Sequence, residues 1–372
     1  MYGSTTFQIL SCLERSWNGF PRATARSETI LKRWPVMMDA ITALRQLDSE
    51  RQANMGARPI MTESLPSVVH TYQNHALDST RWRCYQPRAG DVVISTSPKS
   101  GTTWTLEIVC QLLLPGQSAS ERNDTAPAKA AVWFEPRWSP LDESINQLEA
   151  QQHRRCIQSH LALDGLPFFP QVQYIVVGRD ARDVFMSLWN HHANFTPAFL
   201  DLINSIPDRV GDPMPAAPDD IHEFWHDWIT RGWFDWEREG YPYWGNLHHT
   251  DTWWAYRHLP NILFVHYNDL LADTEGEIRR IAAFLNIPLE EDALPAILQA
   301  VTLNAMRDRA IRAEGSQPLA FAEGSKTFFF KGTNGRWKDV LTDEELALYN
   351  QKVAQVLTPD CRAWLEHGRM AG

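Results

Sequence analysis

Four short apolar runs, separated by helix-like segments, constrain the fold of this chain more than any other feature. They are Asp91–Ser95, Arg155–Ser159, Gln173–Val177 and Asn261–Tyr267. Their apolar residues are mostly continuous rather than alternating, which is typical of parallel strands covered on both faces. Helices are predicted between or after them, over residues 102–114, 181–193, 219–231, 250–258, 274–285 and 343–356. This alternation predicts an α/β fold with a single doubly wound, mostly parallel sheet flanked by helices, and ligands at the carboxyl ends of the strands.

The composition of the 372 residues is that of a globular chain. An apolar share of 44% and a charged share of 22% exclude disordered, collagenous and coiled-coil proteins. The 35 basic and 45 acidic residues leave a net charge of −10, which argues against nucleic acid or an anionic membrane as the main partner. No uncharged apolar run approaches the roughly 18 residues that a membrane span needs. The five cysteines are scattered and form no CxxC pair, so we expect no disulfide framework or zinc site, and a cytoplasmic location.

Residues 1–60 differ from the rest of the chain and are predicted to be an extension. They lack the apolar core of a secretory signal. Three interpretations stay open: a disordered arm, a transit peptide, or a gene start placed too early, since Met55 and Met61 stand just before the first segment of globular character. Helical spacing over residues 36–47 predicts one amphipathic helix within the extension.

Further along the chain, the prolines of residues 197–218 predict a long loop or lid.

The sharpest motif spans residues 97–104, Ser-Pro-Lys-Ser-Gly-Thr-Thr-Trp, between the first predicted strand and the first predicted helix. Gly101 allows the backbone to curl, so that the N–H groups of Ser100 to Thr103 point at one spot that the helix dipole reinforces. Lys99 adds a mobile positive charge. The motif predicts a phosphate site, although a plain strand–turn–helix junction with threonine caps has the same pattern. Its lysine precedes the glycine, which is not the Walker order GxxxxGK[ST] and disfavours an ordinary P-loop ATPase.

Three further features stand at predicted strand ends or before the last helix. Arg179 follows the third strand, where its guanidinium can fork onto a phosphate, and Asp180 is the expected N-cap of the next helix. His160 follows the second strand. A basic, glycine-rich loop covers residues 331–338. Taken singly, each feature also has a structural interpretation: a capped helix with solvated charges, a hydrogen-bonding histidine and a solvent-exposed loop.

Together and in this order, the four features resemble the cytosolic-type sulfotransferase family. Its members transfer a sulfuryl group from 3′-phosphoadenosine 5′-phosphosulfate (PAPS) to a hydroxyl or an amine. The resemblance implies one sulfotransferase domain over residues 66–366, with a P-loop-like nucleotide-binding fold. Trp253-Trp254 looks like the family's paired tryptophans. The stretches 151–166 and 305–307 look closest to bacterial members, some of which sulfate glycolipids.

The resemblance also implies a donor site and a catalytic set. The donor site would hold the 5′-phosphosulfate, the 3′-phosphate and the adenine with Lys99, Ser100, Gly101, Thr102, Thr103, Trp104, Arg179, Ser187, Tyr267, Thr302, Met306, Lys331 and Gly332. The catalytic set would be His160 as general base, Lys99 and Ser187. The unperturbed pKa of histidine, about 6.5, suits removal of a hydroxyl proton near neutrality. No metal is implied, because a sulfuryl group carries less negative charge than a phosphoryl group, and lysine with backbone N–H groups can stabilise it.

Several positions depart from the family pattern, and two of them bear on activity. Gln158 stands where many members place a lysine, and Phe330 stands where an arginine precedes Lys331. Two alternatives therefore stay open: a sulfotransferase-like module that binds nucleotide with weak or no transfer, and a P-loop kinase. The partner implied is a small-molecule or lipid-linked hydroxyl acceptor (a glycolipid, a phenol or an alcohol), without nucleic acid or a membrane span. The protein is expected to be a monomer or homodimer.

Aromatic residues before the last predicted strand are candidates for the acceptor pocket. Because Phe224 and Trp228 lie four residues apart, at least part of the set is expected on a core face. The set is Phe195, Phe224, Trp225, Trp228, Trp233, Trp236, Tyr241, Tyr243 and Trp244. The adjacent histidine pairs 191–192 and 248–249 predict no metal site, since neighbouring residues of a helix point to different faces.

Overall fold

The computed structural model describes residues 65–114, 131–208, 210–314 and 320–369, which belong to a compact unit over Leu65–Gly372. The extension over residues 1–60 and its predicted helix lie outside the described residues. The strands are β1 (Val92–Thr96), β2 (Ala131–Trp133), β3 (Cys156–Ser159), β4 (Gln173–Gly178) and β5 (Ile262–His266). The helices are η2 (Ser79–Cys84), α3 (Thr102–Leu113), α6 (Leu141–Glu149), α7 (Ala181–His192), α8 (Pro197–Asn204), α9 (Ile221–Thr230), α10 (Asn246–Trp254), α11 (Tyr267–Ala272), α12 (Thr274–Phe284), α13 (Leu294–Ala300), α14 (Leu303–Glu314), α15 (Ser325–Phe328), η3 (Arg336–Asp339), α16 (Asp343–Val356) and α17 (Pro359–His367).

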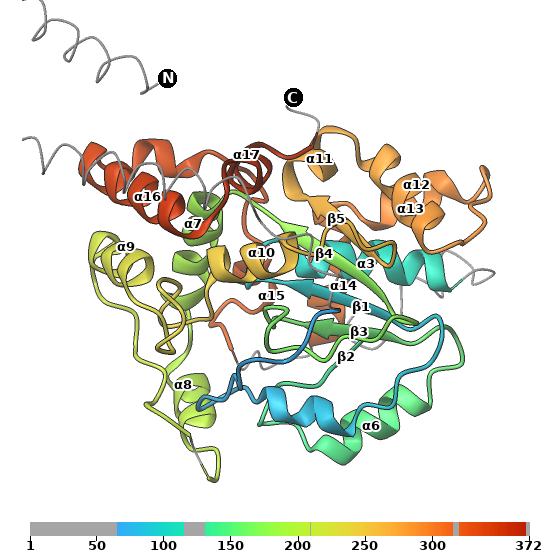
Figure 1. Ribbon diagram of the computed structural model, residues 1–372, viewed down its shortest axis with the longest axis horizontal. Coiled ribbons are helices and arrows are strands. Elements are labelled where there is room, and N and C mark those ends of the chain that lie inside the picture. Colours follow the sequence, from blue (N-terminus) through green and yellow to red (C-terminus); the bar gives the residue numbers. More distant parts are fainter. Residues whose placement is uncertain (1–64, 115–130, 209, 315–319, 370–372) are drawn as a thin grey trace, which may run out of the picture. The chain divides into compact units, whose positions relative to one another are not determined.

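The strands form one parallel sheet in the order β2-β3-β1-β4-β5 (Figure 1). The predicted doubly wound parallel sheet is therefore confirmed. The chain places β2 and β3 on one side of β1, then returns to place β4 and β5 on the other side. Such a reversal opens a crevice at the carboxyl ends of the central strands, which is where α/β proteins bind ligands.

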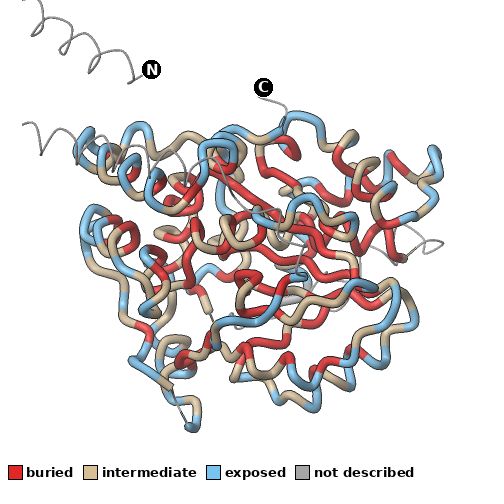
Figure 2. The backbone as a smooth tube through the Cα atoms, in the orientation of Figure 1, coloured by how far each residue is buried: buried red, intermediate tan, exposed pale blue. Residues whose placement is uncertain are grey.

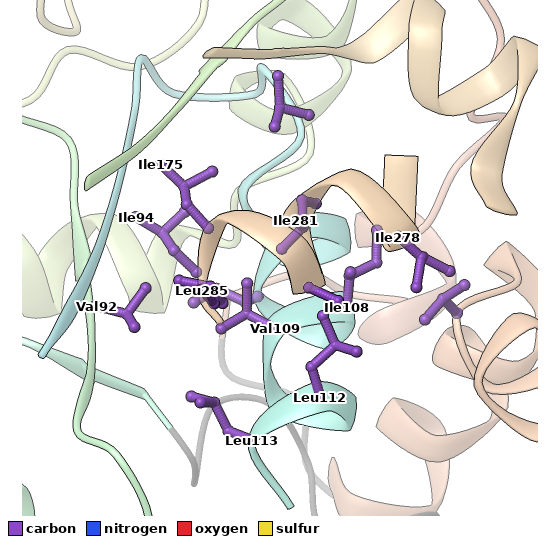
Figure 3. Packing of buried hydrophobic residues seen from close by; sticks show 14 of the residues in the cluster. Val92, Ile94, Ile108, Val109, Leu112, Leu113, Ile175, Ile278, Ile281 and Leu285 are labelled. Atoms are coloured by element: carbon purple, nitrogen blue, oxygen red, sulfur yellow. The ribbon is translucent and has the colours of Figure 1, made fainter. Parts of the chain in front are cut away.

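Both faces of the sheet are buried, which explains the continuous apolar runs (Figure 2). On one face, Val92 and Ile94 of β1 belong to a cluster with α3 and α12, where Ile108 and Ile281 supply the facing side chains (Figure 3). On the other face, Val93 of β1 joins a cluster rich in aromatic rings. Successive residues of one strand thus enter opposite cores, as the two-residue period of a strand requires.

Two predicted helix starts are confirmed by their capping contacts. The Asp180 side chain accepts a hydrogen bond from the Arg182 N–H at the start of α7. Thr342 and Glu345 form a capping box at the start of α16, with each side chain bonded to the other residue's backbone N–H. Both caps satisfy N–H groups that a helix leaves unpaired at its first turn.

Two predictions differ from the structure, and several elements were not predicted, among them the helices α6, α11, α13, α14, α15 and α17. Residues 197–218 are not wholly a loop or lid, because α8 begins at Pro197 with Thr196 as N-cap, its side chain accepting from the Phe199 N–H. Helix α10 begins at Asn246 rather than at residue 250. Its first N–H groups are bound by the buried Glu239 carboxylate, which accepts from Asn246, Leu247 and His248. Strand β2 was not predicted, although its three residues lie in the apolar run over residues 130–134.

Candidate active site

The carboxyl ends of β1, β3, β4 and β5 open into one cavity of about 940 Å³. The four strands deliver, in that order, Lys99, His160, Arg179 and Tyr267, and all four side chains line it. Among the described residues, Lys331 and Arg336 join Lys99 and Arg179 as cations that line the cavity. Within the described part of the chain, no aspartate or glutamate lines it. Such a wall of cations without a carboxylate is suited to a multiply charged anion.

The loop between β1 and α3 takes the curled shape that its glycine predicts. Gly101 has φ +118°, and a Cβ there would lie 3.1 Å from Cδ2 of Tyr267. Lys99 also adopts a left-handed backbone, with φ 69°. Helix α3 begins after Gly101 without a side-chain cap, so its first N–H groups face the loop side without a competing carboxylate or hydroxyl. This is the arrangement of an anion site at a helix N-terminus.

Ser100 is the predicted donor-site residue that the structure places elsewhere. Its side chain is buried and hydrogen-bonded to Oγ of Ser97 at 2.6 Å. Its backbone N–H donates to the Ser97 carbonyl at 3.3 Å, so the prediction of a free amide at Ser100 is wrong. The reason is local: the tight turn after β1 uses the Ser100 amide to close itself.

His160 is held in one tautomer by the backbone of β1. Its Nδ1 lies 2.7 Å from the carbonyl oxygen of Thr96, which can only accept, so Nδ1 carries the proton. Nε2 then carries the lone pair, and it accepts a hydrogen bond of 3.2 Å from the Gln158 amide. Burial, together with the nearby charge of Lys99, lowers the pKa of His160 to about 4, although the Thr96 bond opposes this shift. The imidazole is therefore neutral at pH 7 and able to accept a proton at Nε2.

Lys99 is buried among groups that disfavour its charge. Burial, and then the charge of Arg179, lower its pKa to about 8. Its ammonium lies 4.5 Å from the centre of the Phe328 ring and donates to Nδ1 of His191 at 3.4 Å. Burial lowers the pKa of His191 well below its usual range, and Lys99 adds to this shift, so His191 is a neutral acceptor.

Arg179 ties the loop after residue 330 to the end of β4. Its guanidinium donates to Oδ1 of Asn334 from Nε at 3.0 Å and from one terminal nitrogen at 2.7 Å. Its Cζ lies 4.2 Å from the centre of the Tyr267 ring. The Tyr267 hydroxyl in turn donates to the Gly332 carbonyl at 3.2 Å. These contacts place the glycine-rich loop against the strand ends rather than in solvent.

The structure brings together the predicted site residues other than Ser100. The residues that line the cavity are Lys99, Gly101, Thr102, Thr103, Trp104, His160, Arg179, Ser187, Tyr267, Thr302, Met306, Lys331 and Gly332. His191 and Arg336 line it as well and were not predicted as site residues. His191 was detectable in principle, because it lies four residues after Ser187 on the same face of α7.

The predicted aromatic set divides between the cavity and the core. Phe195, Tyr243 and Trp244 line the cavity. Phe224, Trp225 and Trp228 are instead buried in a hydrophobic cluster with α7 and α16, as their helical spacing indicates. The cavity gains other rings that the pattern did not single out, namely Phe199, Phe321, Phe328, Phe329, Phe330, Trp133 and Trp138.

The described residues contain neither a metal-binding cluster nor a helix that could cross a membrane. In residues 65–114, 131–208, 210–314 and 320–369, no three histidine, cysteine, aspartate or glutamate side chains are grouped so that they could hold a metal ion. None of the helices described in this part of the chain has the length and hydropathy that a membrane crossing requires.

The fold is an α/β fold of the P-loop-like type, and the cavity lies at the switch point of its parallel sheet. A sulfotransferase domain model matches residues 89–359. A glycolipid sulfotransferase of Mycobacterium bovis is 33% identical over 313 residues, with 80% of this chain and 94% of the relative covered. Mouse sulfotransferase 1B1 is 28% identical over 305 residues, with 79% and 94% covered.

The chain belongs to the sulfotransferase family and is a PAPS-dependent sulfotransferase. Its fold is shared with mouse sulfotransferase SULT7A1 complexed with PAP, at a TM-score of 0.55 and 17% identity, with 77% of this chain and 91% of that chain covered. It is also shared with retinol dehydratase in complex with androsterone and the inactive cofactor PAP, at a TM-score of 0.56 and 23% identity, with 74% and 82% covered. The predicted family is confirmed, and the kinase alternative is set aside.

Proposed function

We propose that this protein transfers the sulfuryl group of PAPS to a hydroxyl of a glycolipid, with His160 as the general base. The observation that carries the proposal is the lining of one cavity. Among the described residues, four cations and no carboxylate line it, together with a neutral histidine that has its lone pair at Nε2. The cations suit a donor with several anionic groups. The histidine suits an acceptor that must lose a proton.

The donor fits the cavity with its anionic groups at two places. Lys99 and the uncapped N-terminus of α3 would hold the 5′-phosphosulfate, because both offer N–H donors without a competing anion. Arg179 and Lys331 would hold the 3′-phosphate, together with the Ser187 hydroxyl. The Trp104 ring, which lies edge to face with Tyr267 at 5.4 Å, would contact the adenine.

The transfer step uses His160 and Lys99. PAPS supplies the sulfuryl group, which passes in line to the acceptor oxygen. The acceptor O–H proton moves to Nε2 of His160 as the new O–S bond forms, and the bond from sulfur to the phosphate oxygen breaks. The Lys99 ammonium stabilises the negative charge that develops on this leaving oxygen, as positioned charges do in related group transfers. The products are a sulfate ester and adenosine 3′,5′-bisphosphate (PAP).

The glycolipid acceptor is supported by the relatives and by the cavity. The Mycobacterium relatives bear the name glycolipid sulfotransferase and align over 94% of their length. A cavity of about 940 Å³ lies near the upper end of the ligand-pocket range of about 300–1,000 Å³. Rings such as Phe195, Phe199 and Phe321 line its side nearest α8, and they suit an apolar acceptor body.

The proposal includes a cytoplasmic location. The cysteines at the described positions 84, 110, 156 and 361 are free thiols. Free thiols are typical of proteins from reducing compartments.

The test is a transfer assay with ³⁵S-labelled PAPS. Three acceptors are compared: a glycolipid with free sugar hydroxyls, a simple phenol and a long-chain alcohol, each analysed for labelled product by chromatography. We expect label on the glycolipid, and its loss in His160→Ala while PAP still binds. Label on the phenol or alcohol alone would contradict the acceptor class. PAP binding without transfer to any acceptor would instead favour a nucleotide-binding module that lacks activity.

A further inference from the structure

Arg336 is a cavity-lining cation to which the described residues offer no hydrogen-bond acceptor. It begins η3 and lines the cavity beside Lys331 and Gly332. Its guanidinium lies over the Phe330 ring, 5.4 Å from the ring centre. Among the described residues it forms no hydrogen bond or ion pair, and its Nε is buried without an acceptor. A buried N–H of this kind is costly unless a ligand accepts from it.

The position of Arg336 is held by the residues just before it. Asn334 accepts two hydrogen bonds from Arg179, and the Gly335 N–H donates to Oδ1 of Asp183 at 2.7 Å. Gly335 has φ 81°, a left-handed conformation that turns the chain into η3. Because Arg179 and Asp183 sit at the start of α7, the loop delivers Arg336 to the same end of the sheet as Arg179.

Arg179 alone offers little to an incoming phosphate. A guanidinium has about five N–H donors. Arg179 directs two of them to Asn334, one to the Thr333 carbonyl at 3.3 Å and one to the Lys99 carbonyl at 3.2 Å. A phosphate at this end of the sheet therefore needs donors from another residue.

The two arginines are close enough to affect each other. Burial lowers the pKa of the Arg179 guanidinium, and the charge of Arg336 lowers it further, whereas Tyr267 and Asp183 oppose the shift. Asp183 attracts both guanidinium groups, but the hydrogen bond that its Oδ1 accepts comes from the Gly335 N–H at 2.7 Å. Two neighbouring cations of this kind repel each other until an anion binds to both.

We propose that Arg336 binds the 3′-phosphate of the donor and makes the site select nucleotides that carry this phosphate. The inference rests on the proposed function, in which PAPS is the donor. Lys99 and the N-terminus of α3 serve the opposite, 5′ end of the nucleotide. Arg336 thus binds the 3′-phosphate together with Arg179 and Lys331. It supplies further N–H donors, because most of those of Arg179 are already bonded to protein acceptors.

The test compares two nucleotides that differ only in the 3′-phosphate. Isothermal titration calorimetry would measure the binding of PAP and of adenosine 5′-monophosphate to the full chain and to Arg336→Gln. We expect the Kd for PAP to rise roughly ten- to a hundred-fold, as for loss of a charge-assisted hydrogen bond, with the Kd for adenosine 5′-monophosphate within about twofold. Arg336→Lys should recover part of the PAP affinity, because it keeps the charge.

Lys338→Gln is the matched control, since Lys338 belongs to the same loop but is exposed and does not line the cavity. It should leave both affinities unchanged. Unchanged PAP affinity in Arg336→Gln would overturn the inference. An equal loss for both nucleotides would also overturn it, because Arg336 would then act on the shape of the loop. If the unaltered chain fails to bind PAP, the proposed function itself fails, and this outcome differs from the other two.

Discussion

The Lys99 ammonium should make nucleotide binding depend on pH between 7 and 9. Burial and the neighbouring Arg179 lower its pKa to about 8 in the free protein. A bound anion favours the charged lysine, so binding raises this pKa. The favourable contribution of the Lys99 charge to nucleotide binding is therefore fully present below pH 8 and is lost as the pH rises above that value.

The size of the effect follows from the pKa. With a value of about 8, Lys99 is roughly nine-tenths protonated at pH 7 and roughly one-tenth protonated at pH 9. If only the charged form binds well, the Kd for PAP rises about tenfold over this range, or about 1.4 kcal/mol. Calorimetric titrations at pH 7, 8 and 9 and constant ionic strength would measure it.

Lys99→Arg provides the matched control, because a guanidinium keeps its proton throughout this pH range. Its Kd for PAP should stay flat between pH 7 and 9, whatever its absolute value. A parent protein with a flat profile would show that Lys99 does not contact the nucleotide. A control with the same tenfold change would assign the titration to another group. Either result would refute the reasoning.

Three further predictions concern catalysis, stability and the metal. His160→Ala should lower turnover by about a hundred-fold or more with PAP affinity nearly unchanged, since a general base acts only in the transition state; turnover within threefold of the parent would remove it from the mechanism. Arg155→Ala should lower the free energy of unfolding by about 3–5 kcal/mol in a urea titration, because it leaves the buried Asp91 carboxylate unpaired; a loss no larger than that of the exposed Arg279→Ala would contradict this. Excess EDTA should leave transfer unchanged, and a loss restored by magnesium would overturn the metal-free mechanism.

Much of the site could be predicted from sequence because its elements are local. The strand that ends before Ser97 and the helix that begins at Thr102 are adjacent in sequence, so the curl at Gly101 follows from their spacing. The parallel sheet then brings His160 and Arg179 to the same edge without any further information, since carboxyl ends of parallel strands share one end of the sheet.

What could not be predicted depends on contacts between distant segments. The start of α10 is set by Glu239, whose carboxylate binds N–H groups at Asn246 and beyond. Strand β2 is three residues long, and it is a strand only because β3 pairs with it. From the sequence, Arg336 is expected to be a solvent-exposed loop residue. Its place at the cavity depends on Arg179, about 150 residues earlier, which donates to Asn334 and so holds the loop at the cavity.

The cavity also explains how a chain with a net charge of −10 can bind a polyanion. Net charge acts over the molecular surface as a whole, and salt screens it beyond the Debye length of about 8 Å, so it opposes a long polyanion that would lie along the surface. Inside the cavity the nearest charges decide, and among the described lining residues these are Lys99, Arg179, Lys331 and Arg336. Asp183, the carboxylate beside them, accepts the Gly335 N–H, and burial raises its pKa to about 6. We therefore expect the site to select a small anion that can enter the cavity over a long one that must lie along the acidic surface.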